Sequence, residues 1–470
     1  MTRSWVIGLT LVALVLRFIA LDSQLWTDEV LSLVRYVRKP LEDLFTHFYS
    51  NNQHPLYSLL ARATMDVFGE SPWTLRVWAA LLGAACIPAL YQLGVEVASK
   101  REAFLSAALL AVSYHHVWFS QNARGYTAIM LASIVCTYLM HRGLRDPQPK
   151  FFVLYAIVGG LGTYAHLAMV FTAVGHAAIV APYLIRNVRP ARRWVAPLLA
   201  FPGAAVVTLM LHAPMLTDVI DFFVNKPSPA VGLATPLWAA IETVMSLVEG
   251  FGGIAILGGV VVLIAGALGA LGFFDYLETN PLALGLFIGP VVITGLGVMT
   301  GRGIVYPRFF FGVAAFAILI FLRGGFRLGA LLNRPRLGEV LAIVLIVASA
   351  ASVPINYLKP KQDFEGAMAY VEENKSERDT VASVGIIYNV YEGYYERPWP
   401  KVWSKQQILE RAEGHDGVWL LYMFPDYIKH VNADLMSFVK AECQRLEWFP
   451  GTLRGGGVRA CYIPTPKGPS

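Results

Sequence analysis

The sequence predicts a polytopic membrane domain built entirely of α-helices, followed by a small soluble α/β domain. Of the 470 residues, 56% are hydrophobic and only 15% are charged, which excludes a disordered chain and an ordinary soluble protein. The hydrophobic surplus ends near residue 355. The remainder contains 14 of the 38 basic and 15 of the 32 acidic residues, a density typical of soluble domains. We therefore divide the chain into 1–355 and 356–470.

Eleven apolar segments are predicted to cross the bilayer, whose hydrocarbon core requires about 20 helical residues. The first follows Met-Thr-Arg and lacks a small-x-small cleavage site, so we interpret it as an uncleaved helix. The segments lie near 5–21, 75–97, 103–119, 126–140, 151–165, 167–185, 195–213, 250–273, 281–299, 308–322 and 337–355.

The basic loops set the predicted orientation, because Lys and Arg are concentrated in cytoplasmic loops. The loops near 100–101, 141–150, 186–193 and 323–336 are rich in Lys and Arg, whereas loop 274–281 is acidic and adds no support. This pattern requires that 54–69, which carries Arg62 and Asp66, does not cross. We assign it as a membrane-adjacent helix of a first outer loop, 23–74. The N-terminus is then inside and the soluble domain outside.

Polar residues gather in four clusters that this topology places on the outer side. Charge at hydrocarbon depth costs roughly 2.5 kcal/mol or more per residue, so such clusters often mark a site. His166, at the break between two predicted helices, joins them. The clusters are Trp26-Thr27-Asp28-Glu29, His54-Pro55-Leu56-Tyr57, Ser120-Gln121-Asn122-Ala123-Arg124-Gly125-Tyr126 and Tyr306-Pro307-Arg308.

Each cluster has both a structural and a functional interpretation. Thr27 or Asp28 could cap the following helix, or Asp28 could act as a general base. Arg124 and Arg308 could extend to lipid headgroups, or each planar guanidinium could bind a phosphate. His54 and His166 could be core residues or substrate contacts.

A metal site is not predicted from the histidines. His115 and His116 are adjacent, and neighbouring side chains on a helix point about 100° apart, which disfavours a shared metal ion. The familiar metal-binding and nucleotide-binding motifs are missing from the sequence.

Taken in order, the clusters resemble the GT-C superfamily of polyprenyl-phosphate-dependent glycosyltransferases. The most similar branch contains the protein O-mannosyltransferases and the lipid A aminoarabinose transferase. The resemblance rests on the acidic pair after the first span, His-Pro-Leu-Tyr opening the next helix, Ser-Gln-x-x-Arg-x-Tyr after the third span, and the late Arg. Residues 25–144 carry most of it, and 306–322 and 361–370 add to it.

The resemblance implies specific roles for these residues. Asp28 would be the catalytic carboxylate with Glu29 as its neighbour, and His54, Arg124 and Arg308 would contact the donor phosphate. Substrate-binding roles fall to the remaining aromatic and imidazole side chains, Tyr57, Tyr126, His166 and Tyr306.

The implied reaction moves a sugar from a polyprenyl phosphate to a lipid, glycan or protein acceptor, with inversion. It would take place on the extracytoplasmic face of a prokaryotic inner membrane. Relatives often have an acidic residue in the second outer loop, but 120–127 has none and Asn122 stands in its place. A divalent metal held by both outer loops is therefore not expected, no other cofactor is implied, and basic side chains would neutralise the leaving phosphate.

Several alternatives stay open at this stage. A transporter or flippase for lipid-linked sugars, or a non-catalytic subunit, would use the same outer face. The sequence shows neither a matching polar cluster on the cytoplasmic side nor an inverted repeat, which disfavours a transporter. Cys443 and Cys461 lie on two predicted adjacent strands and could pair in an oxidising compartment. The aromatic stretch 391–403 could stack on sugars or fill the core.

Overall fold

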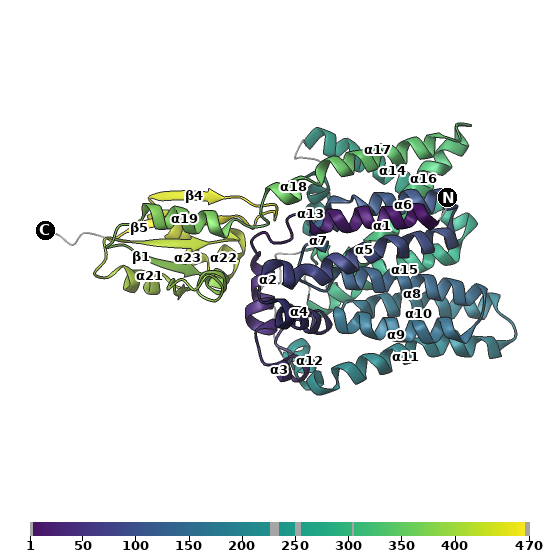
Figure 1. Cartoon of the computed structure of the whole chain (residues 1–470), viewed down its shortest axis with the longest axis horizontal. Helices are drawn as coiled ribbons and strands as arrows, with labels where there is room; N and C mark the ends of the chain where they lie inside the picture. The colour runs from purple at the N-terminus through teal and green to yellow at the C-terminus, as the bar shows by residue number, and fades with distance from the viewer. Residues whose placement is uncertain (1–2, 226–234, 250–254, 303–304, 466–470) are drawn as a thin grey trace. The chain divides into compact units, whose positions relative to one another are not determined.

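The chain forms two compact units in a computed structural model that describes residues 3–225, 235–249, 255–302 and 305–465 (Figure 1). The first unit comprises Met1–Leu21, Pro40–Pro227 and Ala234–Pro354. The second unit comprises Asp22–Lys39 and Ile355–Ser470, apart from the residues outside the described ranges. Each unit is described separately below.

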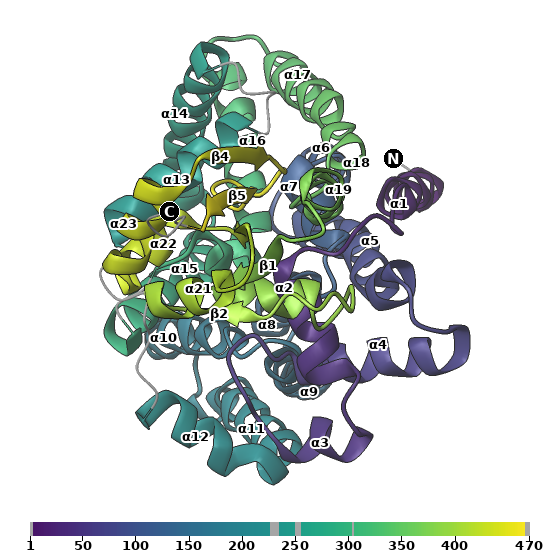
Figure 2. The same ribbon diagram turned by 90° about the vertical axis from the view of Figure 1, so that its left-hand side faces the viewer.

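The first unit is a bundle of α-helices. Figures 1 and 2 show α8 to α11 next to one another. The α-helices are α1 (Arg3–Phe18), α3 (Leu41–Thr46), α4 (Pro55–Phe68), α5 (Pro72–Val97), α6 (Lys100–Ala111), α7 (Tyr114–Ser120), α8 (Tyr126–Arg145), α9 (Pro149–Ala165), α10 (Met169–Asn187), α11 (Val195–His212), α12 (Leu216–Asn225), α13 (Pro236–Glu249), α14 (Ala255–Thr279), α15 (Pro281–Arg302), α16 (Ala314–Leu331) and α17 (Leu337–Ser352), with 3₁₀ segments η2 (Ala191–Trp194), η3 (Ala213–Met215) and η4 (Pro307–Val313).

Within the described ranges, eight helical segments are long and apolar enough to cross a membrane. The pair α6 and α7, bent by 58° at its break, would make a ninth. The predicted polytopic helical fold is thereby confirmed. The two further spans of the predicted eleven correspond to α1 and α9, which have only 16 and 17 residues. Helix α4, predicted to lie along the membrane, has 14 residues.

Local sequence signals explain where several helices begin. The Ser71 hydroxyl accepts a hydrogen bond from the Thr74 amide, and Pro72 occupies the first turn of α5. Ser99 caps α6 in the same way, through the Glu102 amide. Ser113 caps α7 through the His116 amide, so the bend between α6 and α7 is encoded by a helix-starting residue.

Small residues allow α14 and α16 to pack backbone against backbone. A Cβ atom at Gly272 would lie 1.8 Å from the carbonyl oxygen of Ile320, and one at Gly324 would lie 1.8 Å from that of Leu268. Close approach at small residues is a common basis for helix association in membranes, where burial of apolar surface provides little driving force.

Two groups of ion pairs lie at helix ends next to the loops predicted to be cytoplasmic. Arg323 of α16 pairs with Glu102 and Asp275, at the start of α6 and near the end of α14. Arg142 and Arg145 at the end of α8 pair with Glu96 near the end of α5. These charges are scattered in sequence and meet only in the folded bundle. Their mutual pairing is the usual arrangement of structural charges in membrane proteins.

The second unit contains a five-stranded sheet of order β2-β1-β3-β5-β4. Strands β2, β1 and β3 are parallel, whereas β5 is antiparallel to both β3 and β4. Its elements are α2 (Thr27–Ser32), the π-helical turn η1 (Leu33–Val37), α18 (Ile355–Leu358), α19 (Phe364–Asn374), β1 (Thr380–Val384), η5 (Gly385–Ile387), α20 (Tyr388–Tyr391), β2 (Lys401–Val402), α21 (Lys405–Ala412), β3 (Gly417–Tyr422), α22 (Pro425–Val431), α23 (Ala433–Glu442), β4 (Arg445–Phe449) and β5 (Val458–Pro464).

Helices cover both faces of this sheet. On one face, Val418 and Leu420 of β3 pack with residues of α21, α22 and α23. On the other face, Trp419 of β3 contacts the ring of Tyr370 from α19. All six residues of β3 are buried, as expected for a central strand covered on two sides.

The first outer segment, 22–39, belongs to this second unit rather than to the helical bundle. The Thr27 amide and hydroxyl both donate to the side-chain oxygen of Gln362, at 3.0 and 2.6 Å. The Gln24 amide group donates to Asp363 at 3.2 Å. The sequence pattern predicted that 22–39 belongs to the membrane domain. Contacts between residues more than 330 positions apart could not be anticipated from local patterns.

Cys443 and Cys461 form a disulfide, which settles the pairing that the sequence left open. Cys461 lies in β5, opposite Leu446 of β4, and Cys443 lies just before β4. The bond therefore fastens the terminal hairpin to the end of α23. The other two cysteines, Cys86 and Cys136, are buried in the bundle, as expected.

Candidate active site

His54 and Arg124 form the centre of a buried basic cluster in the helical unit. His54 precedes α4, Arg124 lies in the turn between α7 and α8, and each side chain is 3% exposed. Arg124 donates to Nε2 of His54 from Nε at 3.1 Å and from Nη2 at 3.0 Å. Since Nε2 accepts both hydrogen bonds, the imidazole is neutral and carries its proton on Nδ1.

Two aromatic side chains complete this cluster. The ring centroids of His54 and His166 are 4.6 Å apart, and that of Tyr126 lies 5.3 Å from His166. The Arg124 guanidinium lies over the Tyr126 ring at 5.1 Å. A glycine is required at 125, because a Cβ atom there would come within 2.1 Å of the Ala165 carbonyl oxygen. Three connections between helices thus meet at one point: the residues before α4, the α7–α8 turn and the α9–α10 break.

Arg308 adds a second positive charge to the same region. It lies in the first turn of η4, with its guanidinium 4.7 Å from the centroid of the Tyr306 ring. Burial lowers the pKa of His54 well below its usual range; a charge on His166 would lower this pKa further, and the charges of Arg124 and Arg308 do so. Burial, with Arg124 and Arg308, lowers the pKa of His166 to about 3. The cluster therefore combines two guanidinium ions with two neutral imidazoles.

Of the other predicted substrate contacts, Tyr57 has a clear packing role. Its side chain is 3% exposed, and its hydroxyl donates to the Leu75 carbonyl at 2.7 Å. This bond ties the start of α4 to the first turn of α5. Tyr306 packs edge-on against Trp238 of α13, with centroids 5.7 Å apart.

Arg17, which holds the second outer loop in place, was not among the site residues predicted from the sequence. Arg17 ends α1 and is fully buried. It donates to the Ala13 and Ala111 carbonyls at 2.7 and 3.1 Å, to Oγ of Ser120 at 3.2 Å, and lies 2.6 Å from Nδ1 of His116. The available signal was a lone arginine inside the first apolar segment, a position where charge is rare.

The acidic pair Asp28 and Glu29 lies in the second unit, at the start of α2, and its two members differ. Glu29 is fully buried, its carboxylate accepts from the Trp26 amide at 3.3 Å, and Nζ of Lys361 lies 3.9 Å away. Asp28 is half-buried. The N-cap residue of α2 is Trp26 rather than Thr27 or Asp28. The Glu29 carboxylate accepts from the Trp26 amide, which is one of the two hydrogen bonds of a capping box.

The donor set of these residues does not fit a metal centre. Among the residues that the structure describes, no three His, Cys, Asp or Glu side chains are grouped so as to hold a metal ion. The turn that carries Arg124, residues 120–127, contains a guanidinium but no carboxylate, thiolate or imidazole. We derive no catalytic step through a metal.

An apolar pocket of about 350 Å³ adjoins the Arg308 turn within the helical unit. Residues of α13, α15 and η4 line it, including Ala239, Met299, Pro307 and Phe310. Pro307, which lines this pocket, directly precedes Arg308 in the chain.

The bundle with its basic cluster, followed by a small α/β domain, defines a membrane protein with the GT-C glycosyltransferase fold. Residues 52–217 match the family model described as dolichyl-phosphate-mannose-protein mannosyltransferase. Comparison with curated protein sequences finds no match. The solved structures that follow confirm the resemblance inferred from the sequence at the level of the fold.

Solved structures with the same fold cover nearly all of this chain. An oligosaccharyltransferase from Archaeoglobus fulgidus in complex with zinc and sulfate has a TM-score of 0.59 at 13% identity, covering 98% of this chain and 73% of that one. ArnT from Cupriavidus metallidurans bound to undecaprenyl phosphate has a TM-score of 0.56 at 12% identity, covering both chains completely. AglB from Archaeoglobus fulgidus, with an inhibitory peptide and a dolichol-phosphate, has a TM-score of 0.57 at 13% identity, covering 98% of this chain and 74% of that one.

Proposed function

We propose that this protein transfers a sugar from a polyprenyl-phosphate donor to a lipid, glycan or protein acceptor on the extracytoplasmic face of a prokaryotic inner membrane. In this proposal Asp28 is the general base. Arg124, Arg308 and His54 bind the donor phosphate, while Tyr126, His166, Tyr306 and Tyr57 shape the surrounding pocket.

The observation that carries the proposal is the convergence of Arg124 and Arg308 on the neutral pair His54 and His166. Two guanidinium ions in a buried, mainly aromatic setting attract a dianionic or monoanionic phosphate strongly. The imidazoles add hydrogen-bonding groups without adding charge. Solved proteins of this fold, bound to undecaprenyl phosphate and to dolichol-phosphate, support a lipid phosphate as the anion.

The apolar pocket beside Arg308 supports a donor with a hydrocarbon tail. Its lining residues, such as Ala239, Met299 and Phe310, are apolar, and its volume of about 350 Å³ has room for the first units of an isoprenoid chain. A phosphate at the Arg308 guanidinium would leave the tail next to this pocket.

The reaction would then be a single displacement at the anomeric carbon. The acceptor hydroxyl oxygen forms a bond to that carbon and gives its proton to Asp28. The bond from the carbon to the phosphate oxygen breaks, and both electrons leave with the polyprenyl phosphate. Attack opposite the leaving group inverts the anomeric configuration. Fixed guanidinium donors that face the departing charge are typically worth about 3–4 kcal/mol each.

The environments of the acidic pair favour Asp28 over Glu29 as the base. The Glu29 carboxylate is fully buried and holds the Trp26 amide, so it serves as a positioning residue. Asp28 is half-buried and is fixed by the same helix. The Cys443–Cys461 disulfide supports an extracytoplasmic location for the second unit, because such bonds persist in oxidising compartments.

The first experiment compares wild type, Asp28→Asn and the control Asp22→Asn in nanodiscs, with labelled polyprenyl-phosphate sugars and a cell extract as the acceptor pool. We expect release of polyprenyl phosphate from wild type and Asp22→Asn, and at least a hundredfold loss in Asp28→Asn, since a positioned base typically contributes about 10²–10⁴ in rate. Equal turnover in all three would remove Asp28 as the base. Donor binding without turnover would instead indicate a carrier or a non-catalytic subunit.

A further inference from the structure

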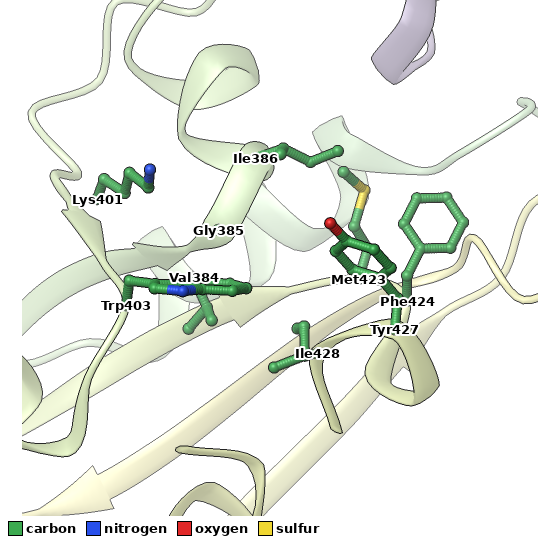
Figure 3. Close-up of a pocket in the computed structure, with 9 residues that line it drawn as sticks. All are labelled: Val384, Gly385, Ile386, Lys401, Trp403, Met423, Phe424, Tyr427 and Ile428. Carbon is green, nitrogen blue, oxygen red and sulfur yellow. The ribbon is translucent and has the colours of Figure 1, made fainter. Parts of the chain in front are cut away.

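The second unit has a pocket of about 120 Å³ at the carboxyl ends of its parallel strands (Figure 3). Val384 ends β1 and Met423 follows β3, and both line this pocket. The neighbours of β1 are β2 on one side and β3 on the other, so the connections after β1 and β2 lead to opposite sides of β1. Ligands of open α/β sheets bind in the crevice at such a switch point.

Trp403 forms a rigidly held wall of this pocket. Its backbone amide donates to the Gln407 side chain at 2.6 Å, and its carbonyl accepts from the Asn432 side chain at 2.7 Å. Its ring lies against Gly385, where an added Cβ atom would approach the ring to 2.8 Å. Gly385 also has φ of +73°, which favours glycine. The chain therefore fixes both the backbone and the ring plane of Trp403.

The opposite wall is formed by a strained turn. Phe424 adopts a left-handed conformation with φ of 52°, which is uncommon for a bulky residue and is often found at binding sites. It precedes Pro425 at the start of α22, and Tyr427 follows one turn later. Figure 3 shows Met423, Phe424 and Tyr427 across the pocket from Trp403 and Lys401.

The chemistry of the lining suits a saccharide ring. Trp403, Phe424 and Tyr427 supply aromatic faces, whose negative π-surface attracts the weakly positive C–H groups on the apolar face of a pyranose. The Tyr427 hydroxyl and the exposed Lys401 amine can hydrogen-bond the ring hydroxyls. The volume is well below the roughly 300–1,000 Å³ of drug-sized sites, which limits the occupant to a single ring.

This pocket adjoins the acidic helix α2 within the same unit. Sδ of Met423 lies 3.3 Å from the Thr27 hydroxyl oxygen and accepts a hydrogen bond from the Gln362 side chain at 3.2 Å. Thr27 directly precedes Asp28 in the chain. A ring bound against Met423 would therefore lie beside the helix that carries the proposed base.

We infer that this pocket binds one saccharide ring of a glycan acceptor. Its role as an acceptor site rests on the proposed function, whereas its capacity to bind a sugar does not. The inference selects a glycan, carried on a lipid or a polysaccharide, from the three acceptor classes.

Binding is tested with the full-length protein in nanodiscs, using methyl α-D-glucopyranoside and methyl α-D-mannopyranoside as probes in saturation-transfer NMR titrations. We expect Trp403→Ala to raise the dissociation constant of the glycoside about tenfold, because the loss of one aromatic contact typically lowers an affinity by roughly a factor of ten. Gly385→Ala should weaken binding too, by displacing the Trp403 ring. Trp448→Ala, at an exposed tryptophan of β4 outside the pocket, should bind like wild type. Thermal unfolding of every variant confirms that it folds.

Each outcome separates this inference from the proposed function. Trp403-dependent binding of a glycoside supports the pocket even if no donor is ever turned over. Unchanged affinity in a folded Trp403→Ala overturns it, even if the protein proves to be an active transferase. Trp403-dependent binding of a Ser/Thr peptide, without glycoside binding, would also overturn it and assign the pocket to a protein acceptor.

Discussion

At the residue scale, Asp28 and Glu29 show how adjacent carboxylates acquire different roles. The Glu29 side chain is enclosed and bonded to the Trp26 amide, whereas Asp28 is half-buried one position earlier. Sequence alone named both as catalytic and could not separate them. The difference arises from the capping geometry of α2 and from Lys361, which is more than 300 residues away in the chain.

This difference predicts that substitution of Glu29 lowers the stability of the protein, whereas substitution of Asp28 leaves it nearly unchanged. Glu29→Ala should lower the free energy of unfolding by about 1–3 kcal/mol, because the buried Trp26 amide loses its acceptor. Asp28→Asn should leave stability within about 0.5 kcal/mol, as expected for a position outside the core. Thermal unfolding of the two purified variants measures both effects. A stable Glu29→Ala that has lost donor turnover would instead make Glu29 the base.

The residues of the basic cluster were identifiable from sequence because each is polar within an apolar context. Arg124, Arg308, His54 and His166 all stood out for that reason, and the structure brings them together. Their mutual geometry was not predictable. The double hydrogen bond from Arg124 to His54 depends on how the α7–α8 turn packs on the α9–α10 break, where Gly125 meets Ala165.

At the element scale, the bend between α6 and α7 is the feature that positions the second outer loop. The last carbonyls of α6 lack partners within the helix, and the Arg17 guanidinium bonds those of Leu110 and Ala111. A cation at a helix C-terminus also interacts favourably with the helix dipole. The same side chain reaches Ser120 and His116 of α7, so it couples α1 to both halves of the break.

Removal of this guanidinium should therefore affect both stability and donor binding. Arg17→Met removes the hydrogen bond to the buried Ala111 carbonyl, at a cost of about 1–3 kcal/mol, and should lower the thermal midpoint in nanodiscs. Because the α7–α8 turn also loses an anchor, the KM for the donor should rise more than kcat falls. Arg3→Met, an exposed arginine of the same helix, is the matched control. An unchanged donor KM in Arg17→Met would restrict Arg17 to a purely structural role.

Element boundaries in the α/β domain show where sequence patterns fail. Strand β1 ends at Val384, because Gly385 turns the chain with φ of +73°, a conformation that an apolar run does not reveal. The two-residue strand β2 and helix α22 were not predicted. A strand of two residues carries no alternation to detect, and α22 follows a left-handed Phe424 that local propensity disfavours.

At the scale of the whole molecule, composition predicted the two kinds of structure but not how the chain divides between them. The hydrophobic surplus marked the helical bundle, and the charge density after 355 marked the soluble domain. Residues 22–39 group with the soluble domain through Gln24, Thr27 and Arg35, which bond residues 362, 363 and 389. The proposed base is consequently built into the domain that carries the proposed sugar pocket.

Topology is the property of the whole molecule on which the proposed function depends, since donor, acceptor and site must share one side of the membrane. The positive-inside pattern predicts that the 186–193 loop lies in the cytoplasm and the second unit outside. Single cysteines at exposed positions test this directly. Ser376→Cys lies in the turn before β1, and Asn187→Cys lies at the end of α10. The native Cys86 and Cys136 are buried and should contribute little background.

We expect a membrane-impermeant maleimide to label Ser376→Cys in intact cells and Asn187→Cys only after permeabilisation. The physical reason is the cost of moving the Arg-rich 186–193 loop across the bilayer during insertion. The opposite pattern would place the disulfide-bonded domain in a reducing compartment, where such bonds are rarely kept. It would also move Asp28 to the cytoplasmic side, and the proposed extracytoplasmic transfer would then be wrong regardless of any turnover measured in detergent.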